Sequence, residues 1–192
     1  MQLLLVHQNF PGQFRELGPA WLAAGHALTA IGCQRAPTWT GLNYWQYALE
    51  PATPLQRGQA VAQLALQLQS RGLWPDAVIA HCGWGESLQL RRVFPEAALI
   101  AYPEIWLSPQ AFGIGFDPAI RLGGTSLDHQ LSQLHHINLL ADLAIHQADA
   151  VVVPTAGQRA SFPPDLQTRI TVIPDGVNDA RLKPDPQAHL LL

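Results

Sequence analysis

The sequence has few charged residues and few cysteines, and it has no long apolar run. Lysine and arginine together make 11 of the 192 residues, and the formal net charge is −3. Because a nucleic-acid-binding surface needs a basic patch, this composition argues against one. No apolar run approaches the roughly 20 residues that cross a membrane, and the N-terminal run is too short for a signal peptide. With only Cys33 and Cys82 there is no disulfide framework, which predicts reduced thiols and a cytoplasmic protein.

A strand, a tight loop and a helix are expected at the start of the chain. Residues 3–6 form an unbroken apolar run, which is typical of a strand covered on both faces. Pro11 and Gly12 end this run, and we expect a helix to begin near Pro11 with Asn9 or Phe10 as its cap. Apolar residues then recur at the spacing of one helix face, at Phe14, Leu17, Trp21 and Leu22.

The loop between this strand and this helix is a candidate ligand site. In α/β sheets, free backbone N–H groups and the helix dipole face the ligand crevice at such a point. Gly12 is the only glycine in the loop, so neither the dinucleotide fingerprint Gly-x-Gly-x-x-Gly nor the phosphate-binding Gly-Lys-Ser/Thr is present. Taken alone, the loop favours a ligand site and a purely structural turn about equally.

Strand-like and helix-like segments alternate along the rest of the chain. Further strands are expected at 26–31, 77–80, 97–102, 150–153 and 169–173, with a short additional strand at 44–49 as an option. Helices are expected at 55–71, 85–93, 126–147 and 156–161. About six strands alternating with helices predict an α/β fold with a doubly wound, mostly parallel sheet.

Two histidines follow predicted strands. His81 comes directly after the strand at 77–80, and His7 comes directly after the first strand. Because the carboxyl ends of parallel strands face the ligand crevice, both residues are expected at one edge of the sheet. His81 could exchange protons and hydrogen bonds near neutral pH, or it could simply cap a turn. Cys82 is not expected to pair with it as a nucleophile, because adjacent strand residues face opposite sides.

Three other features have alternative interpretations. His129 and His136 lie two turns apart on the long helix, but no third ligand is indicated, and no metal site is predicted. Asn138 on the same helix could form hydrogen bonds in a cleft or between loops. A group of aromatic residues could stack on a sugar, although a cover over the core is favoured: Trp39, Tyr44, Trp45 and Tyr47.

Four motifs together resemble the family-4 glycosyltransferases, and more narrowly a bacterial subgroup of them. The motifs are His7-Gln8-Asn9-Phe10-Pro11-Gly12-Gln13-Phe14-Arg15, His81-x-Gly83-Trp84-Gly85-Glu86, Gly115-Phe116-Asp117-Pro118 and Val172-Ile173-Pro174-Asp175-Gly176-Val177. The resemblance covers essentially the whole chain, but only the N-terminal half of the two-domain fold called GT-B. It implies a Rossmann-like acceptor-binding domain over residues 1–177. The tail 178–192 would then be a truncated linker toward a C-terminal donor-binding domain that this chain does not contain.

The resemblance also implies an activity and a set of site residues. Such hexosyltransferases move a sugar from a nucleotide-sugar donor to an acceptor, with retention of configuration and without a metal or other cofactor. His81 matches a histidine that faces the reacting sugar and the acceptor. The loop residues Asn9, Pro11, Gly12 and Gln13 would line the cleft on the donor side. The resemblance gives weaker acceptor-binding candidates at His7, Glu86, Glu104 and Asn138.

The expected partners are the C-terminal donor-binding domain and a sugar or glycan acceptor. Neither nucleic acid nor a transmembrane segment is expected, and peripheral attachment at the inner face of the membrane is an option. Half of a cleft should not catalyse transfer, because donor and acceptor must be held together. An exposed apolar patch is expected where the second domain docks. Two alternatives stay open, namely a stand-alone α/β binding or regulatory module and a small α/β enzyme with its own site around His81.

Overall fold

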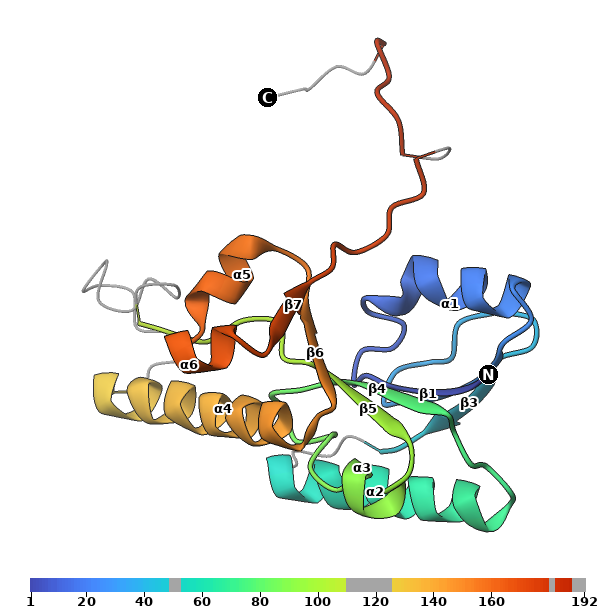
Figure 1. The fold of residues 1–192 in the computed structure, drawn as a ribbon, viewed down its shortest axis with the longest axis horizontal. Helices are drawn as coiled ribbons and strands as arrows, with labels where there is room; N and C mark the ends of the chain where they lie inside the picture. Colours follow the sequence, from blue (N-terminus) through green and yellow to red (C-terminus); the bar gives the residue numbers. More distant parts are fainter. Residues whose placement is uncertain (49–52, 110–125, 180–181, 188–192) are drawn as a thin grey trace.

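A seven-stranded parallel sheet forms the centre of the computed structural model, which describes residues 1–48, 53–109, 126–179 and 182–187 (Figure 1). The strand order is β3-β2-β1-β4-β5-β6-β7, and every neighbouring pair is parallel. The strands are β1 (Gln2–Val6), β2 (Ala27–Gly32), β3 (Asn43–Gln46), β4 (Ala77–His81), β5 (Ala98–Tyr102), β6 (Ala150–Val153) and β7 (Ile170–Val172). From β1 the chain first adds β2 and β3 on one side of the sheet, and then β4 to β7 on the other side. The topological switch point therefore lies between β1 and β4, and the doubly wound α/β prediction is confirmed.

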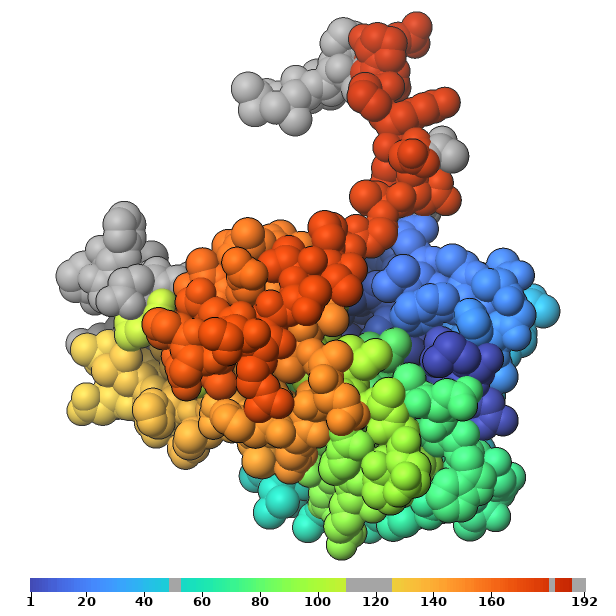
Figure 2. All heavy atoms as spheres, in the orientation of Figure 1, coloured from blue at the N-terminus to red at the C-terminus, as the bar shows by residue number. Residues whose placement is uncertain are grey.

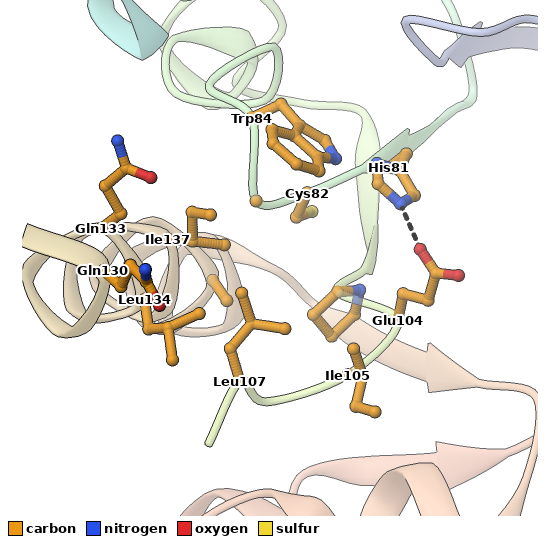
Figure 3. A pocket seen from close by; sticks show the side chains of 13 residues that line it. His81, Cys82, Trp84, Glu104, Ile105, Leu107, Gln130, Gln133, Leu134 and Ile137 are labelled. Carbon is orange, nitrogen blue, oxygen red and sulfur yellow. Dashed lines mark hydrogen bonds and ion pairs between the residues drawn. The ribbon is translucent and has the colours of Figure 1, made fainter. Parts of the chain in front are cut away.

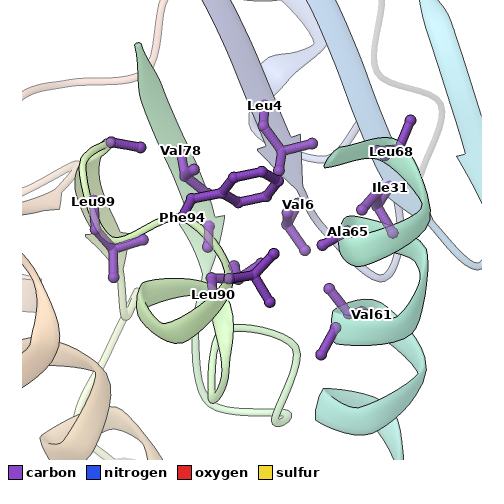
Figure 4. Close-up of a cluster of buried hydrophobic side chains, with 14 of the residues drawn as sticks. Leu4, Val6, Ile31, Val61, Ala65, Leu68, Val78, Leu90, Phe94 and Leu99 are labelled. Atoms are coloured by element: carbon purple, nitrogen blue, oxygen red, sulfur yellow. The ribbon is translucent and has the colours of Figure 1, made fainter. Parts of the chain in front are cut away.

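Helices cover both faces of this sheet, with α1 on one side and α2 and α3 on the other (Figure 1). The helices are α1 (Phe14–Ala23), α2 (Pro54–Ser70), α3 (Leu90–Val93), α4 (Leu127–Gln147), α5 (Ala156–Ser161) and α6 (Pro164–Gln167). Successive residues of β1 serve opposite faces, as the strand geometry requires. Leu4 and Val6 pack with α2 and α3 (Figure 4), whereas Leu3 and Leu5 pack with Phe14 of α1. Both faces are therefore buried, which explains why the sequence of this strand is continuously apolar.

The first helix begins later than the sequence predicts. Residues 8–13 form turns, and α1 starts at Phe14 with Gln13 as an N-cap that makes no side-chain capping bond. The predicted start near Pro11, with Asn9 or Phe10 as the cap, is therefore wrong. The Phe10 side chain is buried among the rings of Phe14, Trp39 and Tyr44. Burial of this ring turns the chain inward before the helix can begin, and it outweighs the capping preference of Asn9.

The helix predicted at 85–93 is also shorter than expected. Residues 83–89 form bends and turns, and only Leu90–Val93 is helical. Gly83 and Gly85 have φ angles of 114° and 109°, which no α-helix contains. Glu86 therefore lies in a turn before the helix and not in its first turn.

The remaining predictions for the described chain are largely confirmed. Ser126 caps α4, since its side chain accepts a hydrogen bond from the His129 N–H. The aromatic segment covers the core, with Trp39 and Tyr44 packed against it and Tyr47 buried. The motif 115–118 lies outside the described residues, as does most of the long irregular stretch before α4. No helix in the four described ranges is long and apolar enough to cross a membrane.

The segment after β7 leaves the body of the domain (Figures 1 and 2). It is anchored where it starts, because the Tyr102 hydroxyl donates a 2.7 Å hydrogen bond to the Asp175 carboxylate. Val177 and Leu182 beyond this anchor are exposed. The described part of the tail thus adds nothing to the core.

Candidate functional site

His7, His81 and Glu104 converge at the carboxyl edge of the sheet. His7 follows β1, His81 ends β4, and Glu104 lies just past β5. The His81 Nε2 atom is 3.0 Å from Glu104 Oε2 (Figure 3), and the ring centroids of the two histidines are 4.6 Å apart. Both imidazoles are buried, whereas the Glu104 side chain is half-exposed. The predicted meeting of His7 and His81 at one edge is therefore confirmed, at the switch point where α/β sheets bind ligands.

His7 is a neutral imidazole at ordinary pH. Burial, followed by the neighbouring His81, lowers the pKa of His7 to about 4, against opposing effects of Gln13 and Glu104. Its Nδ1 accepts a 2.9 Å hydrogen bond from the Asn9 N–H, so Nε2 carries the proton. Gly12 packs against this ring: a Cβ at this position would lie 2.5 Å from His7 Nε2. The glycine in the first motif therefore gives the imidazole its space.

Glu104 sets the tautomer of His81. The hydrogen bond to His81 lowers the pKa of Glu104, so the carboxylate is ionised and can only accept. In the neutral imidazole, the His81 Nε2 atom must then carry the proton, and Nδ1 is the hydrogen-bond acceptor. In the described ranges, Glu104 is also the non-glycine residue with a positive φ, 63°. Such strained backbone is often found at functional positions, where the surrounding structure maintains it.

Three buried side-chain atoms have no hydrogen-bond partner within the described part of the chain: Gln13 Oε1, His81 Nδ1 and Glu86 Oε2. Burying a polar atom without a partner costs about 1–3 kcal/mol, so each such atom needs an explanation. Gln13 and His81 both lie beside His7 at the carboxyl edge, whereas Glu86 lies in the loop after β4 against Tyr47. The unpartnered Nδ1 of His81 leaves an acceptor for a polar ligand at this edge.

Two of the predicted acceptor-binding residues, Glu86 and Asn138, have hydrogen-bond partners within the protein. Glu86 is only 1 % exposed and accepts a 3.0 Å hydrogen bond from the Tyr47 hydroxyl, with an Arg57 nitrogen 3.8 Å away. The Asn138 amide donates to the Leu107 carbonyl and accepts from the Leu107 N–H, each at 2.8 Å. Asn138 therefore joins α4 to the loop after β5.

A pocket of about 480 Å³ opens beside His81 and Glu104 (Figure 3). Its other walls come from the loop after β5 and from one face of α4, with Trp84 across from that face. The α4 positions are Gln130, Gln133, Leu134, Ile137 and Ala141. The sequence alone does not predict a pocket at these positions, although their spacing of three and four residues marks one helix face.

The fold and this site define the class of the protein: a Rossmann-like α/β domain with its ligand crevice at the switch point. The sequence model of the glycosyl transferase family 4 group matches residues 26–182. The chain therefore belongs to this glycosyltransferase family, and the resemblance of its motifs is confirmed. No curated protein sequence matches the chain significantly.

Solved glycosyltransferase structures share this fold. The catalytic domain of starch synthase IV from Arabidopsis thaliana, bound to ADP and acarbose, has a TM-score of 0.52 at 13% identity, over 93% of this chain and 52% of that one. WaaG, a glycosyltransferase of lipopolysaccharide biosynthesis, has a TM-score of 0.56 at 13% identity, over 94% and 46%. A sucrose-phosphate synthase structure from Thermosynechococcus elongatus has a TM-score of 0.54 at 14% identity, over 93% and 91%. The chain spans about half the length of the first two, and its fold is the Rossmann-like half of GT-B enzymes.

Protonation of His7 should make the folded state sensitive to acid. The pKa of His7 is about 4 in the folded chain against an ordinary 6.5, so the unfolded chain binds more protons between these values. Stability should therefore fall as the pH falls through this window, by roughly 3 kcal/mol in total. Urea unfolding of this chain at a series of pH values measures the effect.

A variant pair isolates this contribution. H7Q should flatten the pH dependence of the unfolding free energy above pH 5, where Glu104 stays ionised. H146Q, which changes an exposed histidine of α4, should keep the wild-type slope. If H7Q and wild type have equal slopes, His7 is not the group responsible.

Proposed function

We propose that this chain is the acceptor-side half of a retaining glycosyltransferase that moves a sugar from a nucleotide-sugar donor to an acceptor hydroxyl. The observation that carries the proposal is the lone pair on His81 Nδ1, which is buried without a partner among the described residues. Glu104 holds the opposite nitrogen at 3.0 Å and fixes the tautomer. An acceptor hydroxyl in the adjoining pocket can donate its hydrogen bond to Nδ1, which orients the oxygen for attack.

The loop after β1 is proposed to face the donor. Gln13 offers a buried side-chain oxygen beside the His7 ring, and this oxygen can accept a further hydrogen bond from a sugar hydroxyl. Asn9, Pro11 and Gly12 form the turns around it, and Gly12 leaves room for the His7 ring. The neutral His7 adds no charge beside the reacting groups.

The donor itself is proposed to bind a C-terminal domain of the same protein. The family match and the half-length coverage of starch synthase IV and WaaG support this arrangement. Residues 1–177 would form the acceptor domain and 178–192 the beginning of the linker. Catalysis without a metal, retention of configuration and a cytoplasmic location follow from the motif resemblance and belong to the same proposal.

A screen of nucleotide sugars tests the proposal. The full-length gene product is assayed for donor hydrolysis and for transfer to a panel of glycosides, with this 192-residue chain as the control. We expect activity in the full-length product only, because one half of the cleft cannot hold both substrates. Inactivity of the full-length product toward every donor, with the chain folded and binding glycosides, would favour the stand-alone binding module instead.

A further inference from the structure

A second hollow adjoins the pocket at His81. This groove of about 850 Å³ lies between the first turn of α2 and the middle of α4. The two hollows share Gly83, Trp84, Gln133 and Ile137 in their linings. The ideal Cβ position of Gly83 is 3.7 Å from an Ile137 methyl group, so the loop after β4 borders α4 closely here. A bound molecule can therefore extend from the His81–Glu104 pair along α4 without leaving the surface.

The groove is lined mostly by hydrocarbon. Beyond the shared residues its walls are chiefly leucine side chains: Leu55, Leu88, Leu139, Leu140 and Leu143. An oligosaccharide in such a groove would lose hydrogen bonds to water without replacing them. A hydrocarbon chain would lose none, and its burial is favourable in proportion to its area.

Among the described residues that line the groove, three of the four polar side chains have partners within the protein, and the exception is the exposed His136. Arg57 donates a 2.7 Å hydrogen bond to Gln8 and lies 3.8 Å from Glu86. Thr53 is engaged in the capping box of α2 with Gln56. The Arg57 guanidinium thus turns inward, away from a ligand in the groove, and the leucine walls match an uncharged chain better than a phosphate or a charged peptide.

We propose that the acceptor is amphiphilic, with its hydroxyl-bearing head in the pocket at His81 and an alkyl chain in the groove between α2 and α4. The proposal rests on the acceptor-side function proposed above and adds the substrate class. It differs from the expectation that the exposed apolar residues only dock a second domain, because the groove is continuous with the pocket that holds His81.

Binding of n-alkyl β-D-glucosides to this chain tests the proposal. Titration calorimetry compares methyl, butyl, hexyl and octyl glucoside, each below its micelle-forming concentration. We expect the affinity to tighten by about three- to fourfold for each added methylene, the value for hydrocarbon transferred from water. Equal affinities for the methyl and octyl compounds would overturn the proposal and leave the groove to a second domain.

Matched leucine variants of α4 locate the binding. Leu139 and Leu143 line the groove and are 55% and 43% exposed, whereas Leu127 and Leu131 line neither hollow and are 54% and 36% exposed. Exposed leucines are replaced at little cost to folding. The L139Q/L143Q variant should lose most of the gain from butyl to octyl glucoside, and the L127Q/L131Q variant should keep it. Equal losses in both variants would indicate unspecific binding along the helix and overturn the proposal.

The outcomes for this site and for the enzyme are separable. Chain-length-dependent binding that disappears in L139Q/L143Q supports the amphiphilic site even if the donor screen finds no transfer. Transfer by the full-length product with no dependence of binding on chain length overturns the amphiphilic acceptor and leaves the glycosyltransferase proposal in place.

Discussion

Replacing His81 with alanine is expected to slow sugar transfer by about 10²–10⁴-fold. The variant loses the Nδ1 lone pair that the acceptor hydroxyl would meet, and Glu104 loses its 3.0 Å partner. The effect should fall mainly on kcat, because the bond to the hydroxyl matters most when the oxygen attacks. The measurement is steady-state transfer by the full-length gene product, with the donor that the screen identifies.

Two further variants separate orientation from proton transfer. H81N places an amide near the position of Nδ1, which can accept a hydrogen bond but cannot take a proton at neutral pH. Substantial activity in H81N would show that His81 orients the hydroxyl, whereas a loss equal to that of H81A would indicate proton transfer. E104Q keeps a hydrogen-bonding group but removes the charge that fixes the tautomer. It should cause a smaller loss together with a changed pH profile.

H146A is the matched control for these histidine variants. His146 is exposed on α4 and contacts Asp142 rather than the pocket. Its replacement should leave transfer within about twofold of wild type. Wild-type transfer rates in H81A would contradict the proposed role of His81 and leave it as a structural residue at the end of β4.

The carboxyl-edge cluster could be predicted in part because it follows from strand polarity. An unbroken apolar run places β1 in the middle of the sheet, and His7 and His81 then share an edge whatever the loop details. Glu104 was harder to locate, since its approach to His81 depends on a left-handed φ of 63° at a non-glycine residue. Sequence spacing contains no signal for such a conformation.

The misplaced helix starts have a common physical cause. At both sites tertiary contacts override local preferences: burial of Phe10 delays α1, and the close approach of Gly85 to α2 keeps residues 83–89 out of a helix. The groove between α2 and α4 could not be predicted from the sequence either, because its shape depends on how two helices pack on one sheet. In the sequence, the leucines of α4 that line this groove are part of an irregular apolar stripe, and such a stripe by itself indicates only a buried helix face.

Gly85→Ala is expected to destabilise the chain by about 3 kcal/mol or more. The residue has a φ of 109°, and an added Cβ would lie 2.1 Å from the Pro54 carbonyl oxygen and 2.7 Å from Pro54 Cα. These neighbours are backbone atoms at the start of α2, which the Thr53 capping box holds in place. The clash therefore cannot be relieved by a side-chain rotation. Equilibrium unfolding in urea measures the loss.

Gly72→Ala is the matched control for the backbone conformation. Gly72 has a φ of 93°, but no described atom lies within 4 Å of its ideal Cβ position. Its replacement should therefore cost only the conformational strain, about 1–2 kcal/mol. The difference between the two variants measures how tightly the loop after β4 is held against α2. Since Pro54 and Trp84 both line the groove, equal losses in G85A and G72A would mean that this wall is loose, and that the groove is not preformed for a ligand.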